Sequence, residues 1–110
     1  MGTDRSELLP GTLDMLILQT LSNQSMHGYG IAQHIGRLSR DVLRVEEGSL
    51  YPALQRLQKK GWISSRWGET STKRRARFYT ITASGRRQLG VERSNFELAL
   101  RAIRRVLGTT

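Results

Sequence analysis

Apolar residues recur at helical spacing in several stretches of the chain and alternate with polar residues in two shorter ones. Residues 11–22 carry an apolar stripe at helical spacing, which predicts a first amphipathic helix. The polar triplet 23–25 ends it. A second, short helix is expected to follow residues 27–30, with Ile31, Ile35 and Leu38 facing inward. The stripe of the first helix comprises Leu13, Leu16, Ile17, Thr20 and Leu21.

A third helix is predicted from about Gly48 to Lys60, where Leu50, Leu54 and Leu57 form the buried stripe. Pro52 is compatible with this helix if it falls in the first turn, where backbone amides have no intrahelical partner. Gly61 is expected to end this helix, because glycine is common directly after the last helical residue. Ahead of this helix, residues 42–45 (Val-Leu-Arg-Val) predict a short strand.

Two alternating stretches, 62–67 and 76–81, predict a β-hairpin with a long polar turn at 68–75. Trp62 and Trp67 are expected to anchor the core and the hairpin. Thr82 is a natural N-cap for a last helix over 83–107. This order predicts an α+β, mostly helical fold: a winged helix-turn-helix domain over 8–82 and a C-terminal dimerisation helix over 83–108.

Composition narrows the function classes. The chain has 110 residues, a net charge of +9 and no cysteine, which excludes disulfides and thiolate metal sites. We expect a cytoplasmic protein, because no apolar run approaches the ~20 residues that span a bilayer and no signal-peptide pattern occurs. His27 and His34 have no third ligand close in sequence, and Glu46 and Glu47 suit a helix start better than catalysis. No enzyme motif is found, so no catalytic, metal or cofactor site is expected.

The outer face of the third helix is the first candidate for DNA contact. Arg and Gln side chains can contact guanine and adenine edges, whereas Lys and Ser suit phosphates. Tyr51 lies near the helix start, where free amides also favour a phosphate. The alternative is an ordinary amphipathic helix with a solvated face. The candidate residues are Ser49, Tyr51, Gln55, Arg56 and Lys59.

A basic cluster forms the second candidate. Lys73, Arg74, Arg75 and Arg77 place four positive charges within five residues at the hairpin. These charges repel one another, and a polyanion would relieve the repulsion. In a winged fold the hairpin tip would lie beside the third helix and reach the neighbouring minor groove or its phosphates. The alternative is a flexible, solvent-facing loop.

The last helix carries Leu89, Phe96 and Ile103 at seven-residue spacing. A long helix at the end of a chain has little of its own domain to pack on, so a second copy is expected to cover this stripe. The alternative is that the helix folds back onto the first helix of its own chain. Ala99, Leu100 and Leu107 widen the stripe.

Together these segments resemble the PadR family of transcriptional regulators, in the short form that lacks a large C-terminal domain. The matching segments are 9–13 (Leu-Pro-Gly-Thr-Leu), 27–31 (His-Gly-Tyr-Gly-Ile), 48–54 (Gly-Ser-Leu-Tyr-Pro-Ala-Leu), 61–63 (Gly-Trp-Ile) and 74–79 (Arg-Arg-Ala-Arg-Phe-Tyr). The resemblance implies a homodimeric repressor that docks two third helices into successive major grooves of double-stranded DNA. It also implies release by small aromatic or hydrophobic effectors, for which Phe96 and its stripe are candidates.

Two other function classes stay open. One is a small-molecule-sensing scaffold whose main feature is a hydrophobic pocket between subunits. The other is a basic module that binds RNA or a protein partner. Competition between duplex DNA and structured RNA at fixed salt separates the last from a DNA repressor.

Overall fold

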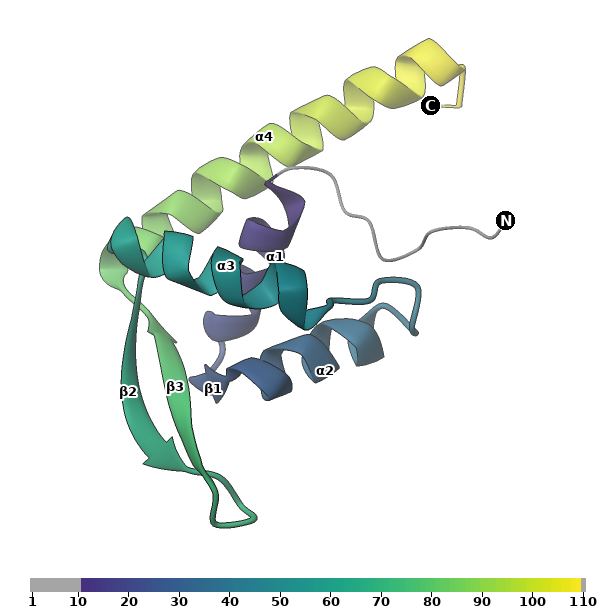
Figure 1. Ribbon diagram of the computed structural model, residues 1–110. Helices are drawn as coiled ribbons and strands as arrows, with labels where there is room; N and C mark the ends of the chain where they lie inside the picture. The colour runs from purple at the N-terminus through teal and green to yellow at the C-terminus, as the bar shows by residue number, and fades with distance from the viewer. Residues whose placement is uncertain (1–10, 110) are drawn as a thin grey trace.

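Four helices and a small sheet make up residues 11–109, the part of the chain that the computed structural model describes. The first three helices pack together, the hairpin projects from one end of this group, and the last helix crosses above it and extends beyond it (Figure 1). This arrangement confirms the predicted winged helix-turn-helix fold. The elements are α1 (Thr12–Leu21), β1 (Met26–His27), α2 (Gly28–Leu38), α3 (Glu47–Lys59), β2 (Ile63–Glu69), β3 (Arg75–Ile81) and α4 (Ala83–Leu107).

The core lies where α1, α2 and α3 meet the base of the hairpin. Each helix contributes most of its predicted apolar stripe, and Ile63 and Ile81 close the core from the sheet. One residue of α4, Leu89, also belongs to this core. Within residues 11–109, no helix is long and apolar enough to cross a membrane. The fully buried side chains include Ile17, Leu18, Ile31, Leu50, Leu54 and Leu57.

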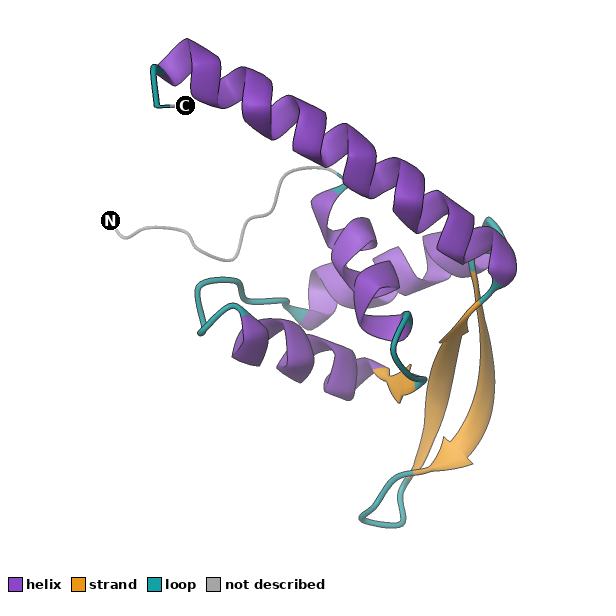
Figure 2. Ribbon diagram, turned by 180° about the vertical axis from the view of Figure 1, so that it is seen from behind, coloured by secondary structure: helices purple, strands orange, loops and turns teal. Residues whose placement is uncertain are grey.

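The sheet has three antiparallel strands in the order β1-β3-β2 (Figure 2). The hairpin β2–β3 runs in continuous register from Ile63 opposite Ile81 to Glu69 opposite Arg75. It is therefore longer than predicted, and only residues 70–74 form the turn. We call β2, β3 and this turn the wing.

Two features of the sheet differ from the prediction, because a segment becomes a strand only when it pairs with another strand. Residues 42–45 form no strand: the Val42 and Leu43 amides donate to the carbonyl and hydroxyl of Ser39, so they are used at the end of α2. The third strand is instead β1, whose two residues pair with Tyr79 and Phe78 of β3. Two residues are too few to produce an alternating pattern.

Two helical details also differ from expectation. Leu38 is 69% exposed, because it is the last residue of α2 and the chain turns through left-handed residues at Arg40 and Asp41 directly after it. Helix α3 begins at Glu47, so Pro52 lies in the second turn instead of the first. Pro52 and Gly48 are both exposed, so water can satisfy the Gly48 carbonyl, which receives no hydrogen bond from proline.

The junction between the wing and α4 is tightly bonded. As predicted, the Thr82 hydroxyl caps α4 by accepting from the Gly85 amide at 3.0 Å. The same hydroxyl donates to the Gly61 carbonyl at 2.7 Å, and the Thr82 amide donates to the Trp62 carbonyl. The start of α4 is therefore fixed to the end of α3 and the start of β2.

Candidate nucleic-acid interface

Helix α3 presents one buried and one exposed face. Leu50, Ala53, Leu54 and Leu57 point into the core. The predicted DNA-facing residues Ser49, Tyr51, Gln55 and Lys59 are all exposed on the other side. The helix-turn-helix geometry thus leaves a polar helix face, more than three turns long, open to solvent.

Arg56 differs from these neighbours. Its guanidinium donates to the Asp14 carboxylate of α1 at 2.9 Å, although 53% of the side chain stays exposed. Arg56 therefore lies on the flank of α3 that faces α1. The structure does not bring it together with the residues that line the wing side of the helix.

The wing carries the predicted basic residues, in two positions. Lys73 and Arg74 lie at its turn, which is closed by bonds between Thr70 and the residues at 73 and 74. Arg75 and Arg77 lie two residues apart on β3, on the same face of the hairpin. All four side chains are exposed.

A hollow runs between α3 and the wing. One cavity of about 560 Å³ lies between α3 and β3, and a second of about 420 Å³ lies between the start of α2 and the wing. Tyr51, Arg77 and Tyr79 line both, so the two cavities are parts of one groove. We call it the α3–wing groove. Its other lining residues include Gln55, Gln58 and Lys59 on one side and His27, Tyr29, Trp67 and Arg75 on the other.

Tyr51 is held in this groove by the start of α2. A methyl group at Gly28 would come within 2.8 Å of the Tyr51 hydroxyl, so only glycine allows this close approach. The Gly28–Gly30 turn is itself fixed by His27, which caps α2 by accepting from the Gly30 amide. The His27 ring also packs edge-on against Phe78 of β3.

Tyr79 was not predicted as a site residue. It is nearly buried at the floor of the groove, and this burial raises the pKa of its phenol, although the charge of Arg77 acts in the opposite direction. Tyr79 therefore stays neutral and can donate a hydrogen bond. The strand alternation of β3, which places it on the face of Arg75 and Arg77, was the signal that could have identified it.

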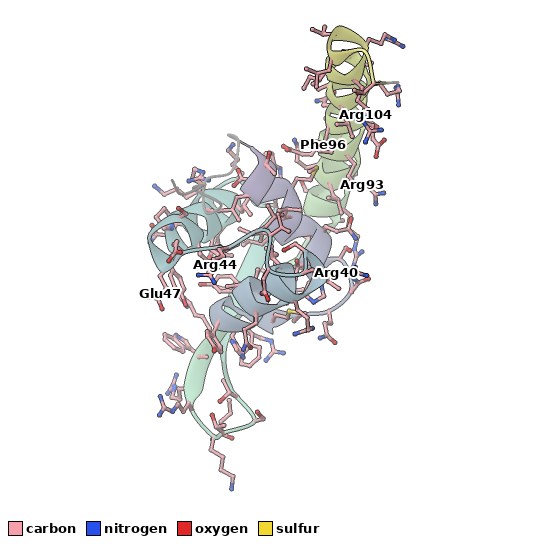
Figure 3. All side chains as sticks on the ribbon, turned by 90° about the vertical axis from the view of Figure 1, so that its right-hand side faces the viewer. Arg40, Arg44, Glu47, Arg93, Phe96 and Arg104 are labelled. Atoms are coloured by element: carbon pink, nitrogen blue, oxygen red, sulfur yellow. The ribbon has the colours of Figure 1, made fainter. Side chains whose placement is uncertain are left out.

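The chemistry of the groove suits a nucleic acid. Its rim supplies cationic groups for phosphates, and α3 supplies amide groups that match base edges. Within the described residues, no group of His, Asp or Glu side chains could hold a metal ion. Figure 3 shows the wing and its side chains at one end of the molecule and Arg104 of α4 at the other.

Comparisons with known proteins agree with this geometry. Residues 17–91 match the model of the transcriptional regulator PadR-like family. An uncharacterized protein of Lysinibacillus sphaericus is 33% identical over 85 residues, which cover 77% of this chain and 78% of that protein. Among solved structures, a transcriptional regulator from Clostridium thermocellum superposes with a TM-score of 0.79 at 30% identity, over 86% of this chain and 92% of that one.

Two further solved structures are similar along almost their whole length. A PadR family transcription regulator from Clostridium difficile R20291 has a TM-score of 0.76 at 26% identity, and the match covers 88% of this chain and 99% of that one. A PadR-like transcriptional regulator from Bacillus cereus has a TM-score of 0.77 at 27% identity, over 93% and 97% of the two chains.

Proposed function

Because the chain belongs to the PadR-like family of transcriptional regulators, we propose that it represses transcription by binding a palindromic operator in duplex DNA as a homodimer. It is a regulator and not an enzyme. The observation that carries the proposal is the α3–wing groove, in which the exposed face of α3 and the basic wing line one continuous hollow. Such a regulator acts where the DNA lies, which we take to be the cytoplasm.

In this proposal α3 enters the major groove and the wing lies over the adjacent backbone and minor groove. Gln55 is placed to contact base edges, while Ser49, Tyr51 and Lys59 contact phosphates. Lys73, Arg74, Arg75 and Arg77 contact the backbone from the wing. Arg56, which is bonded to Asp14, is assigned to positioning α3 against α1 instead of contacting a base.

Helix α4 supports the proposal of a dimer. Its first half packs on α1: Leu89 is in the core and Arg93 donates to Gln19 of α1. Its second half extends past the other helices (Figure 1). Several apolar side chains of this half are exposed. Phe96, Ile103 and Leu107 are 41%, 51% and 68% exposed.

A second copy of α4 is the simplest cover for these side chains, because a monomer leaves them in water. The first half of α4 packs on α1 of its own chain, which was one of the two expected arrangements. In our proposal the second half takes the other arrangement and packs on the partner. Leu89 belongs to the chain's own core and is not part of the proposed interface. That interface comprises Phe96, Ala99, Leu100, Ile103 and Leu107.

The test is selection of bound fragments from random duplex DNA. Two α3 helices related by a twofold axis predict an inverted repeat whose half-sites lie about one helical turn apart, ~34 Å. Recovery of an unrelated set of fragments, or of a single non-repeated site, would contradict the proposal. Competition by structured RNA at equal salt tests the alternative of an RNA-binding module.

Matched charge variants locate the binding surface. Lys59→Gln and Arg77→Gln each remove one positive charge from the α3–wing groove, whereas Arg104→Gln removes one at the far end of α4 (Figure 3). Each groove variant is expected to weaken binding and to lower the slope of log affinity against log salt by about 0.9 per subunit, or about 1.8 for the bound dimer. The slope for Arg104→Gln is expected to stay that of the wild type.

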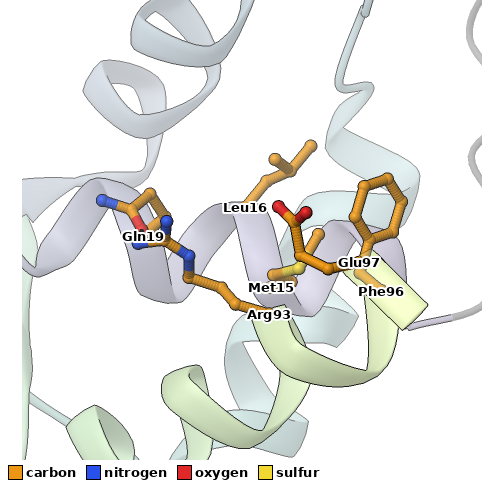
Figure 4. Close-up of a pocket in the computed structure, with 6 residues that line it drawn as sticks. All are labelled: Met15, Leu16, Gln19, Arg93, Phe96 and Glu97. Atoms are coloured by element: carbon orange, nitrogen blue, oxygen red, sulfur yellow. Dashed lines mark hydrogen bonds between the residues drawn. The ribbon is translucent and has the colours of Figure 1, made fainter. Parts of the chain in front are cut away.

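A small effector is a second part of the proposal. An open cavity of about 300 Å³ lies between α1 and α4, lined by the apolar Met15, Leu16 and Phe96 and bordered by Arg93, which donates to Gln19 (Figure 4). This volume is at the lower end of the range for ligand sites, so it suits a small aromatic compound. A panel of such compounds is expected to change the DNA affinity of the wild type. This change is expected to be lost in Phe96→Ala when it is measured against the affinity of that variant without compound, because Phe96 also belongs to the proposed interface.

A further inference from the structure

Trp67 is a large apolar side chain at the surface of the wing. It is 56% exposed and is not part of the core, which on this hairpin includes Ile63, Tyr79 and Ile81. Trp67 therefore lies in the hairpin, as expected, but it is not a core residue. Trp62, in contrast, packs against the core. An exposed indole of this kind does little for folding, so its contacts on the wing are informative.

Those contacts are with two arginines. The guanidinium carbons of Arg75 and Arg77 each lie 5.1 Å from the centre of the Trp67 ring, within the range of a cation–π contact. The backbone register explains the arrangement, because Trp67 lies directly opposite Arg77. Within the described residues neither guanidinium forms an ion pair, although Glu69 is the cross-strand neighbour of Arg75. The indole is thus the group that both cations contact.

Two positive charges held on one ring repel each other, and an anion between or beside them relieves the repulsion. All three side chains line the same part of the α3–wing groove, which also contains Tyr51 of α3. If α3 occupies a major groove, the strand that separates it from the wing passes this point. The two guanidinium groups are therefore placed where backbone phosphates would lie.

We propose that Trp67 is a positioning residue for duplex binding, whose indole holds Arg75 and Arg77 in one arrangement that fits backbone phosphates. This inference rests on the proposed function. Arginines that are already ordered on a ring lose less side-chain freedom when they bind than free ones do. Each exposed cation–π contact corresponds to a factor of about two to five in an equilibrium constant, so two contacts predict about a tenfold effect.

The first test compares Trp67→Leu with Trp67→Phe on a mixed-sequence duplex of about three helical turns. Trp67→Leu is expected to bind about tenfold more weakly for each wing that contacts the duplex, whereas Trp67→Phe, which keeps an aromatic face, recovers most of the affinity. Leu38→Ala is the control, because it removes another exposed apolar side chain, at the far end of α2. Equal affinity of Trp67→Leu and wild type would overturn the inference.

A double-mutant cycle tests whether Trp67 acts through the arginines. In an Arg75→Gln, Arg77→Gln background, Trp67→Leu is expected to change affinity by less than about twofold, because the groups it positions are gone. An undiminished tenfold loss in that background would show that the indole itself contacts DNA, and would overturn the positioning role.

Nuclear magnetic resonance of the free protein separates failure of this inference from failure of the proposed function. Ring currents of Trp67 are expected to shift the side-chain protons of Arg75 and Arg77 upfield in the wild type, and the shift is lost in Trp67→Leu. Absence of the shift would overturn the inference even if the protein binds DNA well. Failure of the wild type to bind any duplex, with the shift present, would instead overturn the proposed function and remove the DNA role assigned to the ring.

Discussion

The attachment of α4 to the wing depends on a glycine, and replacing it should be far more costly than replacing a second glycine of the same helix. Gly85 is buried in the first turn of α4. A methyl group there would lie 2.0 Å from the Trp62 carbonyl oxygen and 2.8 Å from the Ile81 side chain. Gly90, five residues further along the same helix, has nothing within 4 Å of where its own added methyl group would lie.

The expected magnitudes follow from these distances. An ordinary contact needs about 3.4 Å, so Gly85→Ala forces α4 more than 1 Å away from Trp62. That movement breaks the bonds around Thr82 and removes a cap worth about 1 kcal/mol. Overpacking destabilises the fold by about a further 1–3 kcal/mol. The higher helix propensity of alanine offsets about 1 kcal/mol of this loss. We expect a net loss of about 1–3 kcal/mol in the free energy of unfolding.

Urea unfolding at one fixed protein concentration measures this change in the free energy of unfolding, with tryptophan fluorescence as the signal. Gly90→Ala is the matched control and is expected to stabilise the protein by about 0.5–1 kcal/mol, because the same helix gains alanine without a clash. If Gly85→Ala were as stable as the wild type, α4 would not be packed on the wing as described, and the direction of the proposed dimer helix would be wrong.

Two further predictions concern single side chains. Arg56→Gln should cost less than about 1 kcal/mol in the free energy of unfolding, because its ion pair with Asp14 is half exposed; a loss above about 2 kcal/mol would contradict this assignment. Tyr79→Phe should alter the pH dependence of stability. Burial raises the Tyr79 pKa above its ordinary value of 10.0, so the unfolded chain loses this proton at lower pH than the folded one. Stability should therefore fall as pH rises past about 10, and the fall should be smaller in Tyr79→Phe; identical alkaline profiles would refute it.

The sequence predicted the elements whose structure depends only on neighbouring residues in the chain. The stripe of α3, the stop at Gly61 and the Thr82 cap were all recognisable from residue type and spacing, and the structure has them in place. Strand β1 was missed because its strand character comes from β3 and not from its own two residues. The strand predicted at 42–45 failed for the converse reason, since β-branched residues there have no partner strand.

The sequence predicted which parts of the chain form the candidate site, but not which of its residues contact one another. Helical spacing correctly placed Tyr51, Gln55 and Lys59 on the exposed face of α3, but it does not tell which flank meets another helix. Arg56 was therefore grouped with them, although Asp14 lies 42 residues earlier in the chain. Similarly, alternation identified Trp67 as a hairpin residue, and only the register of β2 with β3 brings Arg77 opposite it.

The central claim is that two chains bind one operator together. The number of chains bound per duplex, and the dependence of DNA affinity on dimerisation, test this claim most directly. Sedimentation of the protein with a duplex recovered by selection should give two chains per duplex. Ile103→Glu, which places a charge in the proposed α4 interface, should give a monomer that binds the inverted repeat at least about 100-fold more weakly but a single half-site with wild-type affinity. One chain per duplex at full affinity, or an Ile103→Glu variant that binds the repeat normally, would contradict the account.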